Sequence, residues 1–409
     1  MEYLLFFCIM LILTLISRIF NRSILSPALF MNFLWISFYF LHMLIGEGFY
    51  ISYGSVCTVL FFLLCFNIGT WISQSNRPSI CCIYKLRLSA KNLIQLKKFI
   101  LIFTIISIFA SLYYFYIFVS YCGGFAMYLA SDIRSEMLDI SVPIYVRIPM
   151  LLSYTLTLVA AVYYVKFGGF LRLTFATLPI LISSVAQNGR AGFLMMIFIL
   201  SITSLLRKVI NGEISKPKVN LLVLKYGGYL ALAGGFFFIV GLLFRLRNAG
   251  IDDNSYFFDS FKSYLLGGIS SFDTYLGNPK TLGTGFGRYN FSSLYGLLGI
   301  AVNEVGVYTD YLTFNSAGAT TNIFTLFRPV LDDFGYLFGG IYLMLIGLWG
   351  QNVYRKVMRG DEGSLPFLIL YYTYLFHSPL LPITVHTSIL LSFFVPGFII
   401  KKFSKKIIL

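Results

Sequence analysis

The chain has 409 residues, of which 58% are hydrophobic and only 11% are charged. Soluble domains carry about 25% charged residues, so this chain has too few charges to cover a water-facing surface. The net charge of +15 does not indicate nucleic-acid binding, because the basic residues fall in short clusters between apolar runs and form no basic stripe interleaved with stacking aromatics. The composition therefore predicts an all-α polytopic membrane protein embedded in a lipid bilayer.

Apolar runs follow one another along the chain, and most approach the ~20 residues that cross ~30 Å of hydrocarbon. They cover residues 3–20, 27–45, 51–72, 99–120, 145–165, 170–187, 191–206, 223–244, 336–354, 365–381 and 383–400. The sixth, seventh, tenth and eleventh runs are short or closely abutted, so their boundaries are the least defined. The pattern predicts about eleven transmembrane helices: helices 1–8 within residues 1–244, and helices 9–11 with a cytoplasmic tail within residues 336–409.

Lysine and arginine are distributed unevenly between alternate loops. One side of the predicted membrane holds 22 of the 31 basic residues and three acidic ones, whereas the other side holds nine basic and thirteen acidic residues. Basic residues are enriched in cytoplasmic loops, so the side with 22 is predicted to be cytoplasmic. The N-terminus is then outside, and an odd number of helices puts the C-terminus in the cytoplasm.

Residues 245–335 are predicted to form one long outward loop without a clear span. The loop is too rich in Phe, Tyr, Leu and Gly to be disordered. Apolar residues recur at helical spacing over 255–276, which predicts an amphipathic helix along the outer membrane face, broken near Gly267-Gly268. The stretch 294–301 is apolar but too short to cross, so it either dips into the bilayer or packs on the helix bundle.

Nine basic residues lie on the predicted outer side, although most Lys and Arg residues lie on the cytoplasmic side. Seven of the nine are arginines. The guanidinium group presents a planar fork of donors that matches phosphate oxygens. Arg190 lies in a tight turn between two predicted helices, where it could bind such a group or merely anchor the helix end at the membrane interface. Arg245 ends the eighth predicted helix, where a basic residue often serves only as a stop signal.

Two further arginines belong to the long outward loop. Arg288 follows the glycine-rich stretch 281–287, whose glycines allow the backbone to approach a ligand closely. Arg328 precedes Asp332 by four residues, which predicts an ion pair between them. Asp332 and Asp333 could also cap the ninth helix. Arg190, Arg245, Arg288 and Arg328 are therefore the candidates for binding a phosphate group, with an anchoring or structural role as the alternative.

Three side chains are candidates for catalytic groups. Glu304 lies beside the apolar stretch 294–301, and a partly buried carboxylate has a raised pKa and can act as a base. His377 lies near an outward helix end and could act as a base near neutral pH. Asp273 lies on the polar side of the predicted amphipathic helix. No His pair has the spacing of metal ligands on one helix, so neither a metal nor a cofactor is expected.

Several outward segments resemble those of the bacterial O-antigen and oligosaccharide repeat-unit polymerases of the Wzy type. The resembling segments are Arg328-Pro329, Asp333-Phe334-Gly335-Tyr336, Gly339-Gly340, Gly189-Arg190 and Thr284-Gly285-Phe286-Gly287-Arg288. The resemblance in topology covers most of the chain: a long outward loop precedes a helix that begins near Asp333-Phe334-Gly335-Tyr336. Its sequence motifs are few.

The resemblance implies a metal-independent glycosyltransferase of GT-C-like architecture in the bacterial cytoplasmic (inner) membrane. Its substrates would be undecaprenyl-pyrophosphate-linked repeat units at the outer face, and a chain-length regulator protein would be a partner. The growing chain would move from its lipid pyrophosphate to the non-reducing end of an incoming unit. Metal-dependent GT-C enzymes place paired acidic residues in the first outward loop. In this chain that loop, residues 46–50, has Glu47 as its single acidic residue, which argues against a metal.

Three alternatives remain open. A polysaccharide flippase or exporter is expected to show polar residues buried in mid-helix and an internal repeat, and the sequence shows neither a mid-helix charge nor a visible repeat. An O-antigen ligase would use the same donor with a different acceptor, and the sequence barely separates it from a polymerase. A membrane scaffold without enzymatic activity is disfavoured by the arginine-bearing loop.

Overall fold

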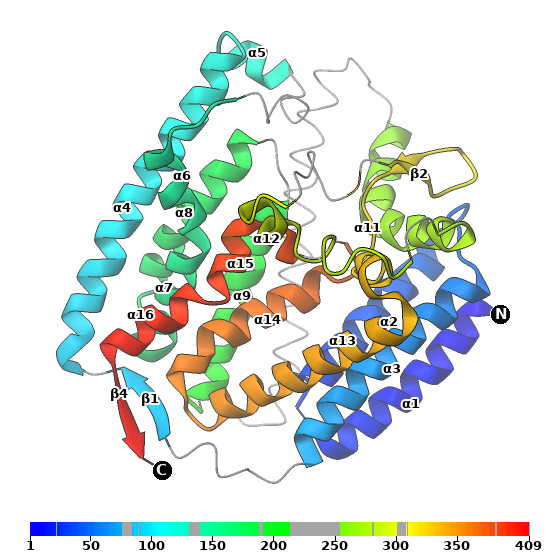
Figure 1. Cartoon of the computed structure of the whole chain (residues 1–409), viewed down its shortest axis with the longest axis horizontal. Helices are drawn as coiled ribbons and strands as arrows, with labels where there is room; N and C mark the ends of the chain where they lie inside the picture. Colours follow the sequence, from blue (N-terminus) through cyan, green and yellow to red (C-terminus); the bar gives the residue numbers. More distant parts are fainter. Residues whose placement is uncertain are drawn as a thin grey trace. The chain divides into compact units, whose positions relative to one another are not determined.

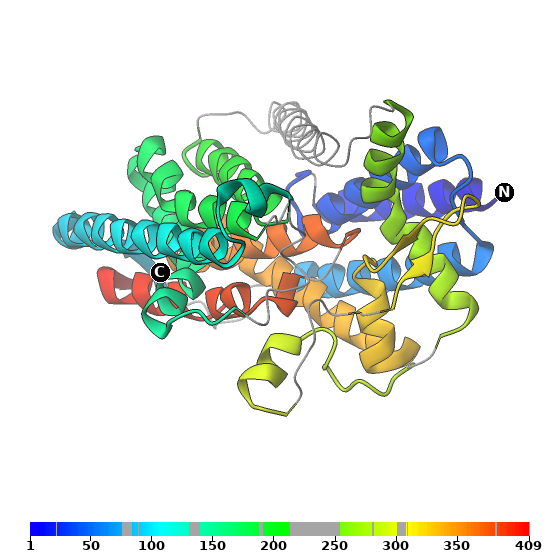
Figure 2. The same ribbon diagram turned by 90° about the horizontal axis from the view of Figure 1, so that it is seen from above.

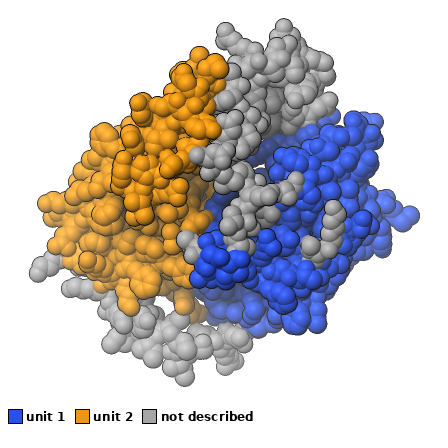
Figure 3. All heavy atoms as spheres, turned by 45° about the horizontal axis from the view of Figure 1, so that its top comes forward, with its two compact units in different colours: residues 1–81, 254–355, 374–386 blue, residues 82–253, 356–373, 387–409 orange. Residues whose placement is uncertain are grey.

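The computed structural model describes residues 1–21, 23–75, 84–88, 90–130, 140–187, 191–212, 254–279, 282–300, 308, 310–380 and 383–408. This part of the chain is mostly helical (Figure 1). It divides into two compact units, coloured separately in Figure 3. Unit 1 comprises residues 1–81, 254–355 and 374–386, and unit 2 comprises residues 82–253, 356–373 and 387–409.

Seven helices in the described part are long and apolar enough to cross a membrane. They are Glu2–Phe20, Pro27–Ile45, Tyr53–Ser75, Asn92–Tyr121, Ile144–Phe167, Gly192–Ile210 and Phe327–Met358. Each coincides with one of the apolar runs in the sequence. The chain is therefore an all-α membrane protein, as its composition predicted.

The other four predicted spans are shorter helices or lie outside the described residues. Helix α8 (Phe170–Ala186) has 17 residues and α14 (Leu365–His377) has 13. At ~1.5 Å per residue, α14 is only about 20 Å long, less than the hydrocarbon thickness. The run 383–400 is divided into η2 (Ile383–Val385), α15 (Thr387–Ser392) and α16 (Val395–Phe403). The run 223–244 lies outside the described residues.

Unit 1 contains the N-terminal helices and most of the long loop. Its helices are α1 (Glu2–Phe20), α2 (Pro27–Ile45), α3 (Tyr53–Ser75), α11 (Asn254–Gly277), α12 (Ser292–Leu297) and α13 (Phe327–Met358), the last ending in unit 2. Strands β2 (Leu312–Thr313) and β3 (Thr320–Thr321) form an antiparallel pair in which Leu312 faces Thr321.

Small residues bring α3 and α13 into close contact. A Cβ atom on Gly69 would lie 1.9 Å from the carbonyl oxygen of Met344, and one on Gly347 would lie 2.2 Å from that of Phe66. Neither position has room for a side chain. In lipid, where no hydrophobic force drives helices together, such close backbone packing is a principal source of helix association.

Polar side chains buried among α1, α2 and α3 bind one another. Ser17 donates to the Oδ1 of Asn67 at 2.9 Å, and the Nδ2 of Asn67 donates to the Oδ1 of Asn32 at 2.9 Å. Asn32 donates back to Asn67 at 3.2 Å. These uncharged groups satisfy each other's hydrogen bonds between helices. Helix packing therefore explains why polar residues lie in the middle of these apolar helices.

Unit 2 contains the central helices and the C-terminal segment. Its elements are β1 (Tyr84–Leu88), α4 (Ala90–Tyr121), α5 (Phe125–Ala130), α6 (Ile144–Leu151), α7 (Ser153–Phe167), α8, α9 (Ala191–Ile210), η1 (Glu362–Ser364), the first nine residues of α14, α15, α16 and β4 (Ser404–Ile408). Strands β1 and β4 pair antiparallel, with Tyr84 opposite Ile408. Helices α6 and α7 are separated only by Leu152, three residues after Pro149, which has no N–H to donate within α6.

Helix α11 corresponds to the amphipathic helix predicted over 255–276. It is continuous through Gly267-Gly268, where a break was expected. Residues 266–272 are all buried, and Ser271 donates to the carbonyl of Ile323 at 2.7 Å. This part of α11 is therefore covered by protein on all sides. The location of the helix along the outer membrane face stays a prediction.

Candidate functional site

The side chain of Arg328 is the centre of a buried cluster in unit 1. Its Nη2 donates to both carboxylate oxygens of Asp310, at 2.7 and 3.0 Å. Its Nε lies 3.5 Å from the Oδ2 of Asp332, so the i,i+4 ion pair predicted from the sequence is present. The Arg328 side chain is 6% exposed and that of Asp310 is 31% exposed, so solvent reaches the pair only from the Asp310 side.

Three aromatic rings surround the same guanidinium group. Its Cζ lies 3.7 Å from the ring centre of Tyr308, 3.8 Å from that of Phe324 and 4.6 Å from that of Tyr275. The negative face of an aromatic ring attracts a cation most strongly where water is excluded. The rings therefore stabilise the charge of Arg328 and restrict its position.

Asp332 connects the rings to the ion pair. It is fully buried and accepts hydrogen bonds from the hydroxyl of Tyr275 at 2.5 Å and from that of Tyr308 at 2.7 Å. Burial, reinforced by the Asp332 carboxylate, raises the pKa of both tyrosines. Both hydroxyls are therefore protonated donors at neutral pH, and Asp332 holds the cluster together.

Two donor atoms of Arg328 make no hydrogen bond in the described structure. Its Nε and Nη1 are buried and lack a hydrogen-bond partner, although Nε lies near Asp332. The Oδ1 of Asn290 is also buried without a partner. An unsatisfied buried donor costs about 1–3 kcal/mol, more when it is charged. Arg328 could thus offer Nη1 to an anionic ligand without breaking an existing hydrogen bond.

The glycine-rich stretch before Arg288 binds the first part of α13, just before that helix kinks. Helix α13 is kinked at Gly335, whose φ of 65° and ψ of −166° are essentially restricted to glycine. Residues 331–333 consequently present carbonyl oxygens that the helix does not use. The N–H groups of residues 283–286 donate to these oxygens at 2.9–3.1 Å. The glycines therefore permit a close approach of two backbones.

Asp333 fixes the next residues of this stretch. Its carboxylate accepts hydrogen bonds from the backbone N–H of Tyr289 at 3.0 Å and of Asn290 at 2.7 Å, and from the Asn290 side chain at 2.7 Å. The predicted role of Asp333 as a helix cap is thus replaced by a role in holding the glycine-rich loop. The ring of Tyr289 stacks on that of Tyr308 with centroids 5.2 Å apart.

Arg288 is therefore connected to Arg328 through two stacked rings. Its backbone adjoins Tyr289, whose ring lies on Tyr308, and Tyr308 in turn lies on the guanidinium of Arg328. The Arg288 side chain is exposed, and no described residue pairs with it. The structure thus brings two of the four predicted arginines into one region, one buried and one exposed.

The remaining candidates lie elsewhere or outside the described residues. Arg190, Arg245 and Glu304 lie outside them. Asp273 is half-buried and accepts hydrogen bonds from the backbone N–H of Ser52, at 2.8 Å, and from its hydroxyl, which ties α11 to the start of α3. His377 is the last residue of α14 and is buried, with its ring 5.3 Å from that of Phe376.

Asp310 is the functional candidate that the sequence did not reveal. It lies 18 residues before Arg328 in irregular chain, so no helical or strand periodicity connects them. Tyr275 appeared in the sequence only as one of the apolar residues of the amphipathic helix. In the described residues, no group of three or more His, Cys, Asp or Glu side chains is arranged to hold a metal ion.

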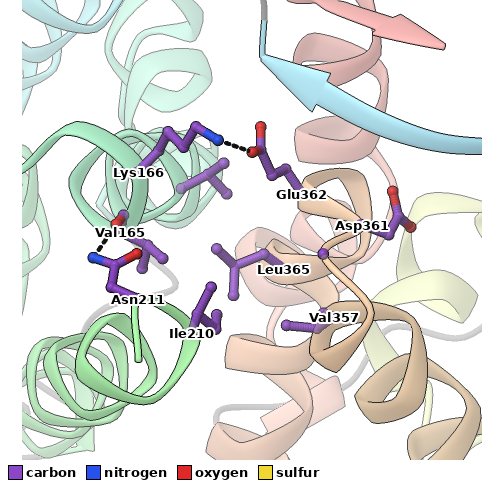
Figure 4. Close-up of a pocket in the computed structure, with 10 residues that line it drawn as sticks. Val165, Lys166, Ile210, Asn211, Val357, Asp361, Glu362 and Leu365 are labelled. Atoms are coloured by element: carbon purple, nitrogen blue, oxygen red, sulfur yellow. Dashed lines mark hydrogen bonds and ion pairs between the residues drawn. The ribbon is translucent and has the colours of Figure 1, made fainter. Parts of the chain in front are cut away.

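A separate cavity of about 250 Å³ lies within unit 2 (Figure 4). Its walls come from α7, α9, η1 and the adjoining ends of α13 and α14. Lys166 and Glu362 point toward each other in Figure 4, with Nζ 2.6 Å from Oε1. The cavity contains none of the site residues predicted from the sequence.

Comparison with known proteins identifies no relative. No family model, no curated protein and no solved structure matches the chain. Any functional assignment therefore rests on the residues themselves.

Proposed function

We propose that the chain is a glycosyltransferase of the bacterial inner membrane. It polymerises undecaprenyl-pyrophosphate-linked oligosaccharide repeat units into O-antigen or capsule-type polysaccharide at the outer face. In this proposal the chain has about eleven spans in a GT-C-like arrangement, with its N-terminus outside and its C-terminus in the cytoplasm. A chain-length regulator protein is its expected partner, and neither a metal nor a cofactor is required.

The observation that supports the proposal is the connection between Arg288 and Arg328 beside the kink of α13. Arg288 offers a guanidinium that no described residue occupies, and Arg328 offers the unpaired Nη1. The tyrosine stack links Tyr289, the residue after Arg288, to the guanidinium of Arg328. Two such groups at the end of a membrane-spanning helix suit a diphosphate that emerges from the lipid.

The expected chemistry needs few other groups. Pyrophosphate is a good leaving group, so its departing oxygens need charge stabilisation rather than protonation, and fixed guanidinium groups provide it in a site of low dielectric constant. The acceptor hydroxyl needs orientation and a base. Glu304, His377 and Asp273 are the candidates for this base from the sequence. Asp310 is a fourth, because it pairs with Arg328 and is partly open to solvent.

The direct test uses purified protein in liposomes with lipid-linked repeat units. Replacing Arg288 by Lys keeps the charge but loses the bidentate fork. We expect about a hundredfold slower chain elongation, the usual effect of losing one such donor, with normal protein abundance. The same replacement at the exposed Arg147 of α6 is the matched control and should leave elongation unchanged. Equal rates for the wild type and the Arg288 variant would refute the assignment of Arg288.

A deletion strain separates polymerase from the alternatives. Loss of a polymerase leaves lipopolysaccharide capped with a single repeat unit, whereas loss of a flippase or a ligase removes even that unit. We expect the single-repeat product, restored to long chains by the wild-type gene. Absence of any repeat unit in the deletion strain would contradict the polymerase assignment and favour one of the two alternatives.

A further inference from the structure

The segment 282–300 of unit 1 exposes large apolar side chains, although it contains no membrane-spanning helix. Phe286 is 80% exposed, Leu298 62% and Ile300 66%, and Leu282 and Leu294 are about two-fifths exposed. Figure 2 shows this yellow-green segment beside the start of α13, within unit 1. The sequence left open whether 294–301 dips into the bilayer or packs on the bundle, and the exposure of its described members disfavours packing.

Several polar backbone groups of the segment are hydrogen-bonded within the protein. The N–H groups of residues 283–286 bind the carbonyls of residues 331–333, and the carbonyl of Phe286 accepts a hydrogen bond from the hydroxyl of Tyr295 at 2.6 Å. The carboxylate of Asp333 accepts hydrogen bonds from the N–H groups of Tyr289 and Asn290. Non-helical backbone can lie at membrane depth only where protein satisfies its hydrogen bonds, and the N–H groups of residues 283–286, 289 and 290 and the carbonyl of Phe286 meet that condition.

Phe286 has an unusual backbone conformation for its residue type. Its φ of 49° makes it the one non-glycine residue with a positive φ in the described part of the chain. A bulky side chain disfavours this conformation, and exposure of the ring to water would add a further cost. Burial of the ring in lipid would offset both costs.

The exposed apolar side of the segment continues onto an exposed apolar surface of α13. A Cβ atom on Gly283 would lie 3.5 Å from the backbone nitrogen of Gly335, where α13 kinks. Immediately beyond the kink, Tyr336, Leu337 and Phe338 are exposed on a helix that is long and apolar enough to span the membrane. The segment therefore adjoins the exposed apolar surface of a helix that could span the membrane.

We propose that residues 282–300 form a membrane wedge, a non-spanning segment whose apolar side chains lie among the lipids of the leaflet that α13 enters at Tyr336. Phe286 and Leu298 are its main contacts, and Arg288, which belongs to the same segment, lies at the level of the lipid phosphates. A second copy of the chain or another protein covering the same side chains is the competing explanation. The proposal does not depend on which reaction the protein catalyses.

Fluorescence quenching in liposomes tests the wedge. Phe286→Trp and Leu298→Trp are each reconstituted in ordinary and in brominated phospholipids, and the emission of the parent protein, with its three tryptophans, is subtracted. Ala317→Trp, in the exposed turn between β2 and β3, is the matched control. We expect brominated lipid to remove most of the emission added at 286 and 298 and little of that added at 317.

Two outcomes would overturn the proposal. Quenching at 286 and 298 equal to that at 317 would show that the segment lies in water. Protection of these positions from both brominated lipid and aqueous iodide would show that protein covers them. If the variants do not fold, labelling of the unmodified protein with a lipid-dissolved carbene, mapped by mass spectrometry, decides the same question: residues 282–300 must be labelled, and the turn at 316–318 must not.

Discussion

Replacing Asp332 by Asn should strongly destabilise unit 1. The carboxylate is fully buried, accepts two tyrosine hydroxyls and lies 3.5 Å from the Nε of Arg328. Asn has a similar shape but no charge, so Arg328 would lose its only fully buried counter-charge in the described structure. Breaking a buried ion pair from one side typically costs about 3–5 kcal/mol. The measurement is the free energy of unfolding in mixed micelles by titration with sodium dodecyl sulfate.

Asp310→Asn is the matched control for this prediction. It removes a carboxylate that is closer to Arg328, at 2.7 Å, but is 31% exposed. Water partly screens that interaction, so its loss should cost only about 1 kcal/mol. The cluster would then depend mainly on Asp332. Equal destabilisation by the two variants, or a wild-type stability for Asp332→Asn, would refute the reasoning that burial decides the strength of these two ion pairs.

Four further predictions follow from the same structure and sequence. The proposed glycosyl transfer by purified protein should survive EDTA, and loss of activity that a divalent cation restores would contradict the proposed metal-independent mechanism. A topology reporter fused after residue 280 should score external and one after 358 cytoplasmic; a cytoplasmic score at 280 would contradict the predicted orientation. Gly347→Leu should lower the unfolding midpoint in micelles, because even a Cβ would lie 2.2 Å from a backbone oxygen of α3; an unchanged midpoint would contradict that packing. Burial raises the pKa of Tyr275 and Tyr308 above 10, so their contribution to the free energy of unfolding should be complete below pH 10 and decline as the pH rises further. The Tyr275→Phe variant should show a smaller decline of the free energy of unfolding over the same pH range.

The membrane character and most of the helices could be predicted from the sequence alone. Seven apolar runs correspond to seven helices of sufficient length in the described residues, and the amphipathic pattern over 255–276 corresponds to α11. Both signals depend on properties that a single segment carries by itself. A helix in lipid satisfies its own backbone hydrogen bonds, so the length and hydropathy of the segment are enough to predict it.

The Arg328–Asp332 ion pair was also predictable, because i,i+4 residues are neighbours on any helix. The rest of that cluster was not. Asp310, Tyr308 and Tyr275 reach the guanidinium from irregular chain and from another helix, and no periodicity relates their positions. Gly335 is a second example of a feature that the sequence did not predict. The residue is visible in the sequence, but only the structure shows that α13 is kinked there.

The sequence by itself determined that this protein lies in a membrane and where seven of its long apolar helices run. The tertiary structure alone decided that Arg328 is enclosed by aromatic rings and carboxylates while Arg288 stays exposed. It also decided that the glycine-rich loop binds the kink of α13. The physical reason is that hydropathy and helical period are local properties of a segment, whereas burial, ion pairing and ring stacking depend on which distant segments meet.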